Sequence, residues 1–373
     1  MQFLTDILVA VLTSYLAFTN MLGDSIASLF PEQAAPSGHL SVQMAPEKKV
    51  SDETLAPLIE SLESEYKQST SLPDILIQNA AYQKASVIDG VRVEEINTTK
   101  VPDALVNIYC TYKTDNYVRT NTGTGFFIDS AGVILTNAHV AQFLILETVN
   151  KTGETECIIR AGDPAKPLYK AELLHISPAW ILKHADLIAQ ENPQGTGERD
   201  YALLFVTAGL DNAPMPARFP YLSFDTSLLS TKMLDQEVLV AGYPAETFFE
   251  DGPDAELRPQ SASSTVTDMF TFGSNYADIV SIAGSVIGEH GASGGPILNS
   301  EGKVIGLIST KGSPEEGSGS LRALTLSYVD RTILQESAID LRQLISGRLA
   351  LRAQLFTETI VPFLSEALES ELE

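Results

Sequence analysis

The sequence has few basic residues, and this shortage narrows the classes of protein to consider. Twenty-four Lys and Arg stand against 48 Asp and Glu in 373 residues, which gives a formal net charge of -24. A chain this acidic repels phosphate backbones and lacks the basic surface of nucleic-acid-binding proteins. We therefore exclude nucleic acid as the main partner.

Cysteine is also scarce and occurs only as Cys110 and Cys157. Two cysteines are too few for a disulfide scaffold, and they lack the short Cys and His spacings of zinc sites. One disulfide and two free thiols are the alternatives that remain. The sequence gives no reason to expect a metal or a cofactor.

The chain lacks an apolar run long enough to span a bilayer comfortably. Its most apolar segment, residues 7–22, has 16 residues, whereas a spanning helix needs roughly 20. Residues 1–30 contain no Lys or Arg, so the basic start of an ordinary signal peptide is missing as well. Residues 1–30 have two interpretations: a signal or anchor segment that associates with a membrane through residues 7–22, or an apolar surface-seeking helix.

What the chain does contain is 44% hydrophobic residues, enough for one large domain with extensions or for two ordinary domains. Residues 31–50 hold several prolines among small and polar residues, which predicts a linker. Residues 51–101 predict a helical extension, with one helix over 51–68 and a second, short helix over about 74–84. Residues 331–373 again follow a helical pattern and predict a C-terminal tail that packs against the domain or a partner.

The central residues 102–330 consist of short runs of Val, Ile, Phe and Tyr separated by Gly, Asn, Asp and Pro. This spacing is typical of antiparallel barrels. The runs fall into two sets, over about 102–215 and 216–330, so we predict an all-β core of two barrels. The predicted strands are 104–112, 123–129, 133–137, 154–160, 169–176 and 201–207, then 237–242, 262–272, 279–283, 296–298, 304–309 and 323–327.

The most specific motif is GASGGP at residues 291–296, which places Ser293 among residues with little or no side chain. Such a turn lets a substrate carbonyl come close to the serine. The backbone N–H groups of Gly291 and Ser293 are the natural pair to stabilise the oxyanion that forms when a serine attacks an amide. Taken alone, the motif has a second interpretation as a tight glycine turn without chemistry.

Two other fragments supply the partners that a nucleophilic serine needs. His139, in TNAHV, ends an apolar run, and an imidazole held there can accept the serine proton near neutral pH. Asp200, in RDYAL, precedes an apolar strand, and a buried carboxylate beside the imidazole fixes its tautomer and stabilises its cation. The order His, Asp, Ser, with several strands between the fragments, favours a catalytic triad.

TNAHV, RDYAL and GASGGP resemble the three catalytic blocks of the trypsin-like (chymotrypsin-fold) serine peptidases, especially their bacterial housekeeping branch. The resemblance covers residues 102–330 and extends to GTGFFI, AGYP and VIGL. It implies two six-stranded Greek-key barrels with the active site between them. It also implies a serine endopeptidase that cleaves protein or peptide substrates through an acyl-enzyme.

Alignment with the family through the serine motif places the primary specificity pocket near Ile287, Ser309, Thr310 and Lys311. An apolar Ile287 cannot offset the desolvation of a substrate Lys or Arg, which favours small or medium apolar side chains before the cleaved bond. Lys311 leaves room for an acidic preference.

The resemblance also bears on the two cysteines. Cys110 falls on the first predicted strand and Cys157 on the fourth, which are neighbours in a barrel of this family and allow a disulfide. Two buried reduced thiols are the alternative. A disulfide persists only outside a reducing cytosol, so together with the apolar N-terminus it favours a secreted, periplasmic or membrane-anchored protein.

The sequence departs from some members of the family in two places. No basic residue followed by an Ile-Val-Gly-Gly start precedes the first barrel, so activation by a freed N-terminus is not supported. The helical pattern after residue 330 gives no sign of a strand-rich PDZ module. A catalytically silent relative that binds peptides and a membrane-associated scaffold are the alternative functions, and the intact triad motifs favour the peptidase.

Overall fold

The computed structural model describes residues 83–84, 101–115, 118–149, 153–190, 195–244, 256–284, 287, 292–311 and 320–372. All of them belong to the unit Leu72–Glu373. The predicted segment 1–30 and linker 31–50 lie outside the described residues, as does most of the extension 51–101. Within that extension, Gln83–Lys84 forms a strand, β1, because its backbone pairs with a strand of the second barrel. The helix predicted over 74–84 is therefore wrong at these two residues.

The first barrel is made of six antiparallel strands, as predicted. They are β2 (Leu105–Lys113), β3 (Val118–Asp129), β4 (Val133–Thr136), β5 (Glu154–Ala161), β6 (Lys166–Ile176) and β7 (Ala202–Gly209). They close in the order β2-β3-β4-β7-β6-β5. Buried apolar side chains such as Ile108, Ile134 and Leu204 fill the interior, because alternate strand residues point inward. The largest difference from the predicted strands is at β3, which begins at Val118 and not at residue 123.

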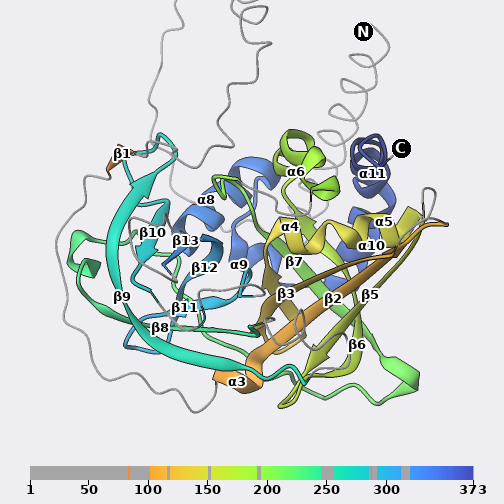
Figure 1. Cartoon of the computed structure of the whole chain (residues 1–373), viewed down its shortest axis with the longest axis horizontal. Helices are drawn as coiled ribbons and strands as arrows, with labels where there is room; N and C mark the ends of the chain where they lie inside the picture. Colours follow the sequence, from red (N-terminus) through yellow and green to blue (C-terminus); the bar gives the residue numbers. More distant parts are fainter. Residues whose placement is uncertain are drawn as a thin grey trace, which may run out of the picture. The chain divides into compact units, whose positions relative to one another are not determined.

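The second barrel also has six antiparallel strands. They are β8 (Glu237–Gly242), β9 (Gln260–Thr271), β10 (Ile279–Ile282), β11 (Pro296–Leu298), β12 (Val304–Lys311) and β13 (Leu321–Thr325). The order β9-β10-β13-β12-β11-β8 closes through pairing of β8 with β9, and β1 adds to the outer edge of β9. Figure 1 shows both sets of strands. The prediction of two six-stranded barrels with a chymotrypsin-like arrangement is confirmed.

Several short helices between the strands were not predicted. They are α3 (Val101–Ala104), α4 (Ala138–Ala141), α5 (Phe143–Val149), α6 (Pro178–His184) and the 3₁₀ turns η2 (Ala185–Ala189), η3 (Leu210–Asn212) and η4 (Thr231–Met233). The start of α6 carries a readable signal, since Ser177 accepts a hydrogen bond from the Trp180 N–H and Pro178 follows it directly.

The C-terminal residues form four helices, α8 (Leu326–Ser337), α9 (Leu341–Leu344), α10 (Leu349–Thr359) and α11 (Val361–Glu369). Helix α8 begins before the expected boundary at 331, because Thr325 caps it by accepting a hydrogen bond from the Tyr328 N–H. This cap ends β13 at Thr325, whereas the sequence predicted strand to residue 327.

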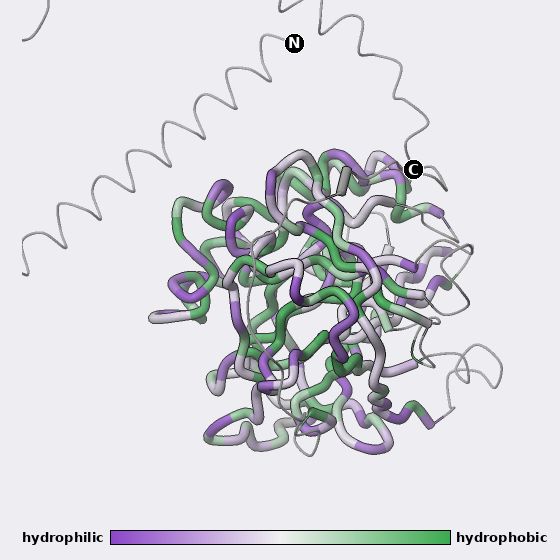
Figure 2. Tube along the Cα trace, turned by 90° about the vertical axis from the view of Figure 1, so that its left-hand side faces the viewer, coloured by the Kyte–Doolittle hydropathy of each residue, from purple (hydrophilic) through white to green (hydrophobic). Residues whose placement is uncertain are grey.

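These helices pack on both barrels. Leu341, Leu344 and Leu349 belong to the core cluster that also holds Leu135 of the first barrel and Leu298 of the second. Residues of α11, namely Val361, Leu364 and Leu368, join the core of the first barrel. Figure 2 shows hydrophobic stretches along the inner strands and hydrophilic ones at many outer turns. Over the residues that the structure describes, no helix combines the length and apolar character needed to cross a bilayer.

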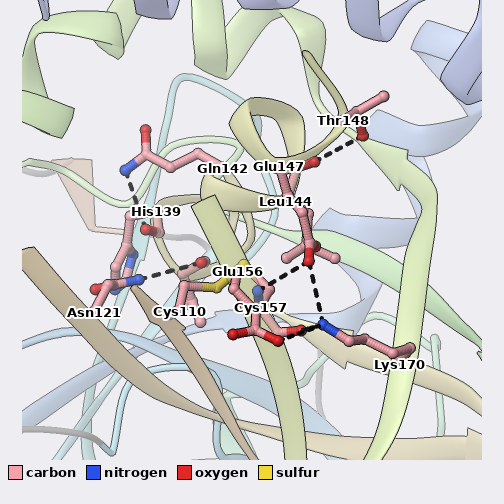
Figure 3. Close-up of a disulfide and its surroundings, with 11 residues drawn as sticks. Cys110, Asn121, His139, Gln142, Leu144, Glu147, Thr148, Glu156, Cys157 and Lys170 are labelled. Carbon is pink, nitrogen blue, oxygen red and sulfur yellow. Dashed lines mark hydrogen bonds and ion pairs between the residues drawn. A yellow bond between two sulfur atoms is a disulfide. The ribbon is translucent and has the colours of Figure 1, made fainter. Parts of the chain in front are cut away.

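A disulfide joins Cys110 on β2 to Cys157 on β5 (Figure 3). The two residues face each other across the antiparallel pair, with their Cα atoms 4.1 Å apart. Glu147 of α5 lies beside the bridge, where its carboxylate accepts a hydrogen bond from the Cys157 N–H and lies 3.5 Å from Lys170 Nζ. Burial raises the pKa of Glu147, whereas the hydrogen bond from Cys157 and the charge of Lys170 lower it. Burial has the larger effect, so the pKa of Glu147 lies above its usual value. Of the two alternatives for the cysteines, the structure has the bridge.

Replacing both cysteines by alanine is expected to lower the free energy of unfolding by about 2–5 kcal/mol, because the bridge restricts the unfolded chain across a separation of 47 residues. Urea unfolding of the wild type and the double variant measures the difference. A reductant provides the control, because it should destabilise the wild type and leave the double variant unchanged. Equal midpoints for the two proteins without reductant would contradict the prediction.

Candidate active site

His139 lies in the first turn of α4, directly after β4. The residue between them, Asn137, has an extended backbone, and its side-chain amide donates a 2.8 Å hydrogen bond to the backbone carbonyl of Asp200. The end of β4 is thereby tied to the start of β7. This contact brings the backbone of His139 next to Asp200.

The side chains of His139 and Asp200 are in direct contact. Nδ1 of His139 lies 2.8 Å from Oδ2 of Asp200, and the His139 backbone N–H donates to Oδ1 at 2.9 Å. Ser309 of β12 donates its hydroxyl to Oδ2 at 2.7 Å. Asp200 is buried, whereas 22% of the His139 side chain is exposed. The imidazole is therefore fixed through Nδ1, and its Nε2 edge lies on the side away from the carboxylate.

The protonation state of Asp200 follows from these contacts. Burial alone would raise its pKa, because an apolar environment disfavours a carboxylate. The charge of His139 and the hydrogen bonds from His139 and Ser309 act in the opposite direction and outweigh burial, so the pKa of Asp200 lies below its usual value. An ionised Asp200 at neutral pH favours the imidazole tautomer with the proton on Nδ1 and stabilises an imidazolium.

The loop that carries Asp200 is closely packed. Gly197 has a φ of 77°, and a Cβ there would lie 2.8 Å from Ser309 Oγ, the group that hydrogen-bonds Asp200. Arg199 has a φ of 58°, a left-handed conformation that costs a residue with a Cβ about 1–2 kcal/mol. Contacts from outside the loop must therefore hold this conformation.

Ser293 comes from the second barrel, in the turn before β11, and is partly buried. Its backbone carbonyl accepts a 2.8 Å hydrogen bond from the Thr124 N–H of β3 in the first barrel. The next residue, Gly294, has a φ of 86°, and a Cβ there would lie 2.0 Å from the Thr124 carbonyl oxygen and 2.6 Å from Thr136 Oγ1. Only glycine permits this approach, so the glycine after Ser293 lets the turn sit against the strands that lead to His139.

Gly123 completes the contact between the serine turn and the histidine helix. A Cβ at Gly123 would lie 2.5 Å from a methyl group of Val140, the residue after His139. It would also lie 3.3 Å from the backbone oxygen of Ser293. The absence of a side chain at this position therefore lets Val140 and Ser293 pack on the same stretch of β3.

The other residues predicted for the site have different environments. Gly291 lies outside the described residues, so of the two expected oxyanion donors the structure describes Ser293. Ile287 is fully buried in the core of the second barrel. Ser309, expected at the pocket, directs its hydroxyl to Asp200. Thr310 is partly exposed and Lys311, at the end of β12, is exposed.

Sequence reasoning did not single out Thr124 and Asn137, and it assigned Ser309 to the substrate pocket and not to Asp200. Thr124 bonds the Ser293 carbonyl through its N–H and the Tyr243 N–H through its hydroxyl, at 2.9 Å. Asn137 and Ser309 both bond Asp200. No local pattern distinguishes these side chains from ordinary polar residues of strands and caps, because their partners are distant in the sequence.

Comparison with known proteins identifies one domain family. Residues 123–307 match the trypsin-like peptidase domain. A comparison with curated proteins finds no match.

Solved structures of the Rv3671c protease from M. tuberculosis are among those similar to this chain. The inactive form of a serine-to-alanine mutant is 20% identical, with 69% of this chain and 98% of that chain covered and a TM-score of 0.40. The active form is also 20% identical, with 69% of this chain and 95% of that chain covered and a TM-score of 0.39.

Proposed function

Because this chain belongs to the trypsin-like peptidases through its domain at residues 123–307, we propose that it is a serine endopeptidase. In this proposal Ser293 is the nucleophile, His139 the general base and Asp200 the residue that orients the base. The observation that carries the proposal is the 2.8 Å contact between His139 Nδ1 and a buried Asp200 carboxylate whose pKa is lowered.

The proposed reaction has two halves. His139 Nε2 takes the proton of the Ser293 hydroxyl while the oxygen attacks the peptide carbonyl, and the N–H groups of Ser293 and Gly291 stabilise the oxyanion. The protonated imidazole then gives its proton to the leaving amine, the C–N bond breaks, and an acyl-enzyme remains. In the second half, His139 Nε2 takes a proton from water while the water oxygen attacks the ester, and it then gives this proton to the Ser293 oxygen as the ester C–O bond breaks and the acid product leaves.

The packing of the two barrels supports this assignment. Ser293 comes from the second barrel and His139 from the first, and the Thr124–Ser293 backbone bond fixes one barrel against the other at this point. Holding a nucleophile and its base in a fixed geometry replaces a costly encounter by an intramolecular step. The low pKa of Asp200 supplies the charge that a transient imidazolium needs beside it.

A fluorophosphonate probe tests the proposal, because it reacts covalently with a serine that a neighbouring base activates. We expect a single adduct on the intact chain, located at Ser293 by peptide mass spectrometry. Labelling should disappear in His139→Ala, which keeps the serine but removes the base. A folded wild type that forms no adduct would favour the alternative of a catalytically silent domain that binds peptides or acts as a scaffold.

We further propose a preference for small or medium apolar side chains before the cleaved bond. The sequence supports it, because the resemblance places Ile287 at the pocket and an isoleucine there offers no charge to a substrate Lys or Arg. Profiling with a peptide library measures the preference, and we expect Ala, Val and similar residues to dominate before the cleaved bond. A profile dominated by Arg, Lys or Glu would reject the proposal, and a Glu profile would identify Lys311 as the determinant.

An extracytoplasmic location is part of the same proposal. The Cys110–Cys157 disulfide supports it, since such bonds persist in oxidising compartments. The segment 7–22, proposed to associate with a membrane, lies outside the described residues. Protein lysed and denatured in a thiol-alkylating reagent should carry no alkylated cysteine, and two alkylated cysteines would oppose this location.

A further inference from the structure

Glu336, near the end of α8, contacts both chain neighbours of Asp200. Its Oε1 accepts hydrogen bonds from Arg199 Nη1 at 2.5 Å and from Ser177 Oγ at 2.7 Å. Its Oε2 accepts a 3.4 Å hydrogen bond from the hydroxyl of Tyr201. One carboxylate from the C-terminal helices thus holds the residue before Asp200 and the residue after it.

The same face of α8 makes further contacts with this stretch. Tyr328, Thr332 and Glu336 recur at intervals of four residues and so lie on one side of the helix. Tyr328 lies near Arg199, and Thr332 lies near Tyr201. Next to Glu336, Gln335 accepts a hydrogen bond from Arg199 Nη2 at 3.2 Å. Helix α8 therefore contacts residues 199 and 201 through several of its side chains.

The surroundings of Glu336 keep it charged. Burial alone would raise its pKa, but the contacts with His175 and Ser177 and the charge of Arg199 together lower the pKa below its usual value. His175 Nε2 lies 3.5 Å from Oε2, and its ring stacks on Tyr201 with centroids 6.0 Å apart. An ionised carboxylate is a stronger acceptor than a neutral acid, so the hydrogen bond that Glu336 accepts from Arg199 is charge-assisted.

The stretch that Glu336 contacts has an unfavourable backbone conformation at Arg199. Arg199 has a left-handed backbone with a φ of 58°, directly before the catalytic aspartate. Asp200 must at the same time present Oδ2 to His139 Nδ1 and Oδ1 to the His139 N–H. A small rotation of the backbone at residue 199 would move both oxygens, and the imidazole would lose its orientation.

We propose that Glu336 is a positioning residue for catalysis, which holds Arg199 and Tyr201 so that Asp200 keeps its geometry toward His139. The inference rests on the proposed function and extends it to the C-terminal helices. Glu336 acts through Asp200 and His139 and has no assigned contact with substrate. Its loss should therefore lower kcat and leave KM nearly unchanged.

The test compares three variants of the full chain on a peptide substrate. Glu336→Ala removes every hydrogen bond of the carboxylate and should lower kcat about 10- to 100-fold, with KM changed by about twofold at most. Glu336→Gln keeps an acceptor oxygen for Arg199 and Ser177, so it should recover part of kcat. The matched control is Arg331→Ala, a change in the same helix. It removes the ion pair in which Arg331 Nη2 lies 2.5 Å from Asp278 Oδ1, and it should leave kcat unchanged.

Each result separates the inference from the function on which it rests. A folded wild type without hydrolysis or probe labelling refutes the peptidase itself. An active wild type with an unchanged kcat in Glu336→Ala overturns the inference alone, as does an equal loss of kcat in Arg331→Ala, which would indicate general destabilisation. If Glu336→Ala fails to fold, Glu336→Gln is compared with Arg331→Ala instead. A wild-type kcat in Glu336→Gln then overturns the inference.

Discussion

Replacing Ser293 by alanine is expected, under the proposed function, to lower kcat for peptide hydrolysis by about 10⁵- to 10⁶-fold, as removal of the nucleophile does in serine peptidases. The variant loses the oxygen proposed to form the acyl-enzyme, while the backbone of the turn and its hydrogen bond to Thr124 remain. Because alanine is smaller than serine and the site is only partly buried, the fold should be unaffected. Initial rates at saturating substrate measure the loss.

A serine from the same barrel provides the control for this variant. Ser300 lies in the turn between β11 and β12 and is 6% exposed, so Ser300→Ala removes a more deeply buried hydroxyl. We expect Ser300→Ala to keep the wild-type kcat. A rate within about tenfold of the wild type in Ser293→Ala would refute the assignment of the nucleophile, since a full acyl-enzyme mechanism cannot operate without it.

Asp200→Asn is expected to lower kcat by about 10⁴-fold at neutral pH without unfolding the protein. The amide keeps the shape of the side chain, but its NH₂ group can face Nδ1 of His139 and select the tautomer whose Nε2 already carries a proton. That tautomer cannot accept the proton of Ser293. The loss of the negative charge also removes the stabilisation of the imidazolium.

A second buried aspartate gives a matched comparison for Asp200. Asp278 is fully buried and accepts hydrogen bonds from Thr271, Ser274 and Arg331, but it lies at the start of β10 and contacts none of the three proposed catalytic residues. Asp278→Asn should destabilise the protein and leave kcat unchanged. Equal losses of kcat in the two variants would show that burial, and not contact with His139, explains the effect.

The lowered pKa of Asp200 also predicts how stability depends on pH. The folded protein binds this proton less tightly than the unfolded chain, whose aspartates titrate near about 3.9. The contribution of Asp200 to stability is therefore complete above that pH and is lost as the pH falls toward the folded pKa. The difference in free energy of unfolding between wild type and Asp200→Asn should shrink over this acidic range, and a difference that grows would contradict the assigned direction.

The barrels could be predicted because the information for each strand is local. Short apolar runs end at glycine, asparagine or proline, and the period of two places alternate residues in the core. Helix α5 escaped the same reasoning, because Phe143, Leu144, Ile145 and Leu146 are consecutive and all buried, so no helical period is visible. Strand β1 escaped it because pairing with β9 overrides the local helical preference.

The candidate site likewise has parts that could be predicted from the sequence and parts that could not. The motifs around His139, Asp200 and Ser293 are visible because each holds a recognisable local pattern. The hydrogen bond from Ser309 to Asp200 spans 109 residues and the ion pair of Arg199 with Glu336 spans 137, so neither leaves a local trace. Such contacts depend on how the barrels and the C-terminal helices dock, which a single sequence does not display.

The dependence of the site on parts from across the chain has a consequence during biosynthesis. His139 and Asp200 are translated well before Ser293, and the helix that holds Arg199 ends only at Ser337. A polypeptide still emerging from the ribosome therefore lacks either the nucleophile or the brace for its aspartate until Ser337 has been made. Under the proposed function, neighbouring nascent proteins are protected from cleavage by the order in which the residues are made.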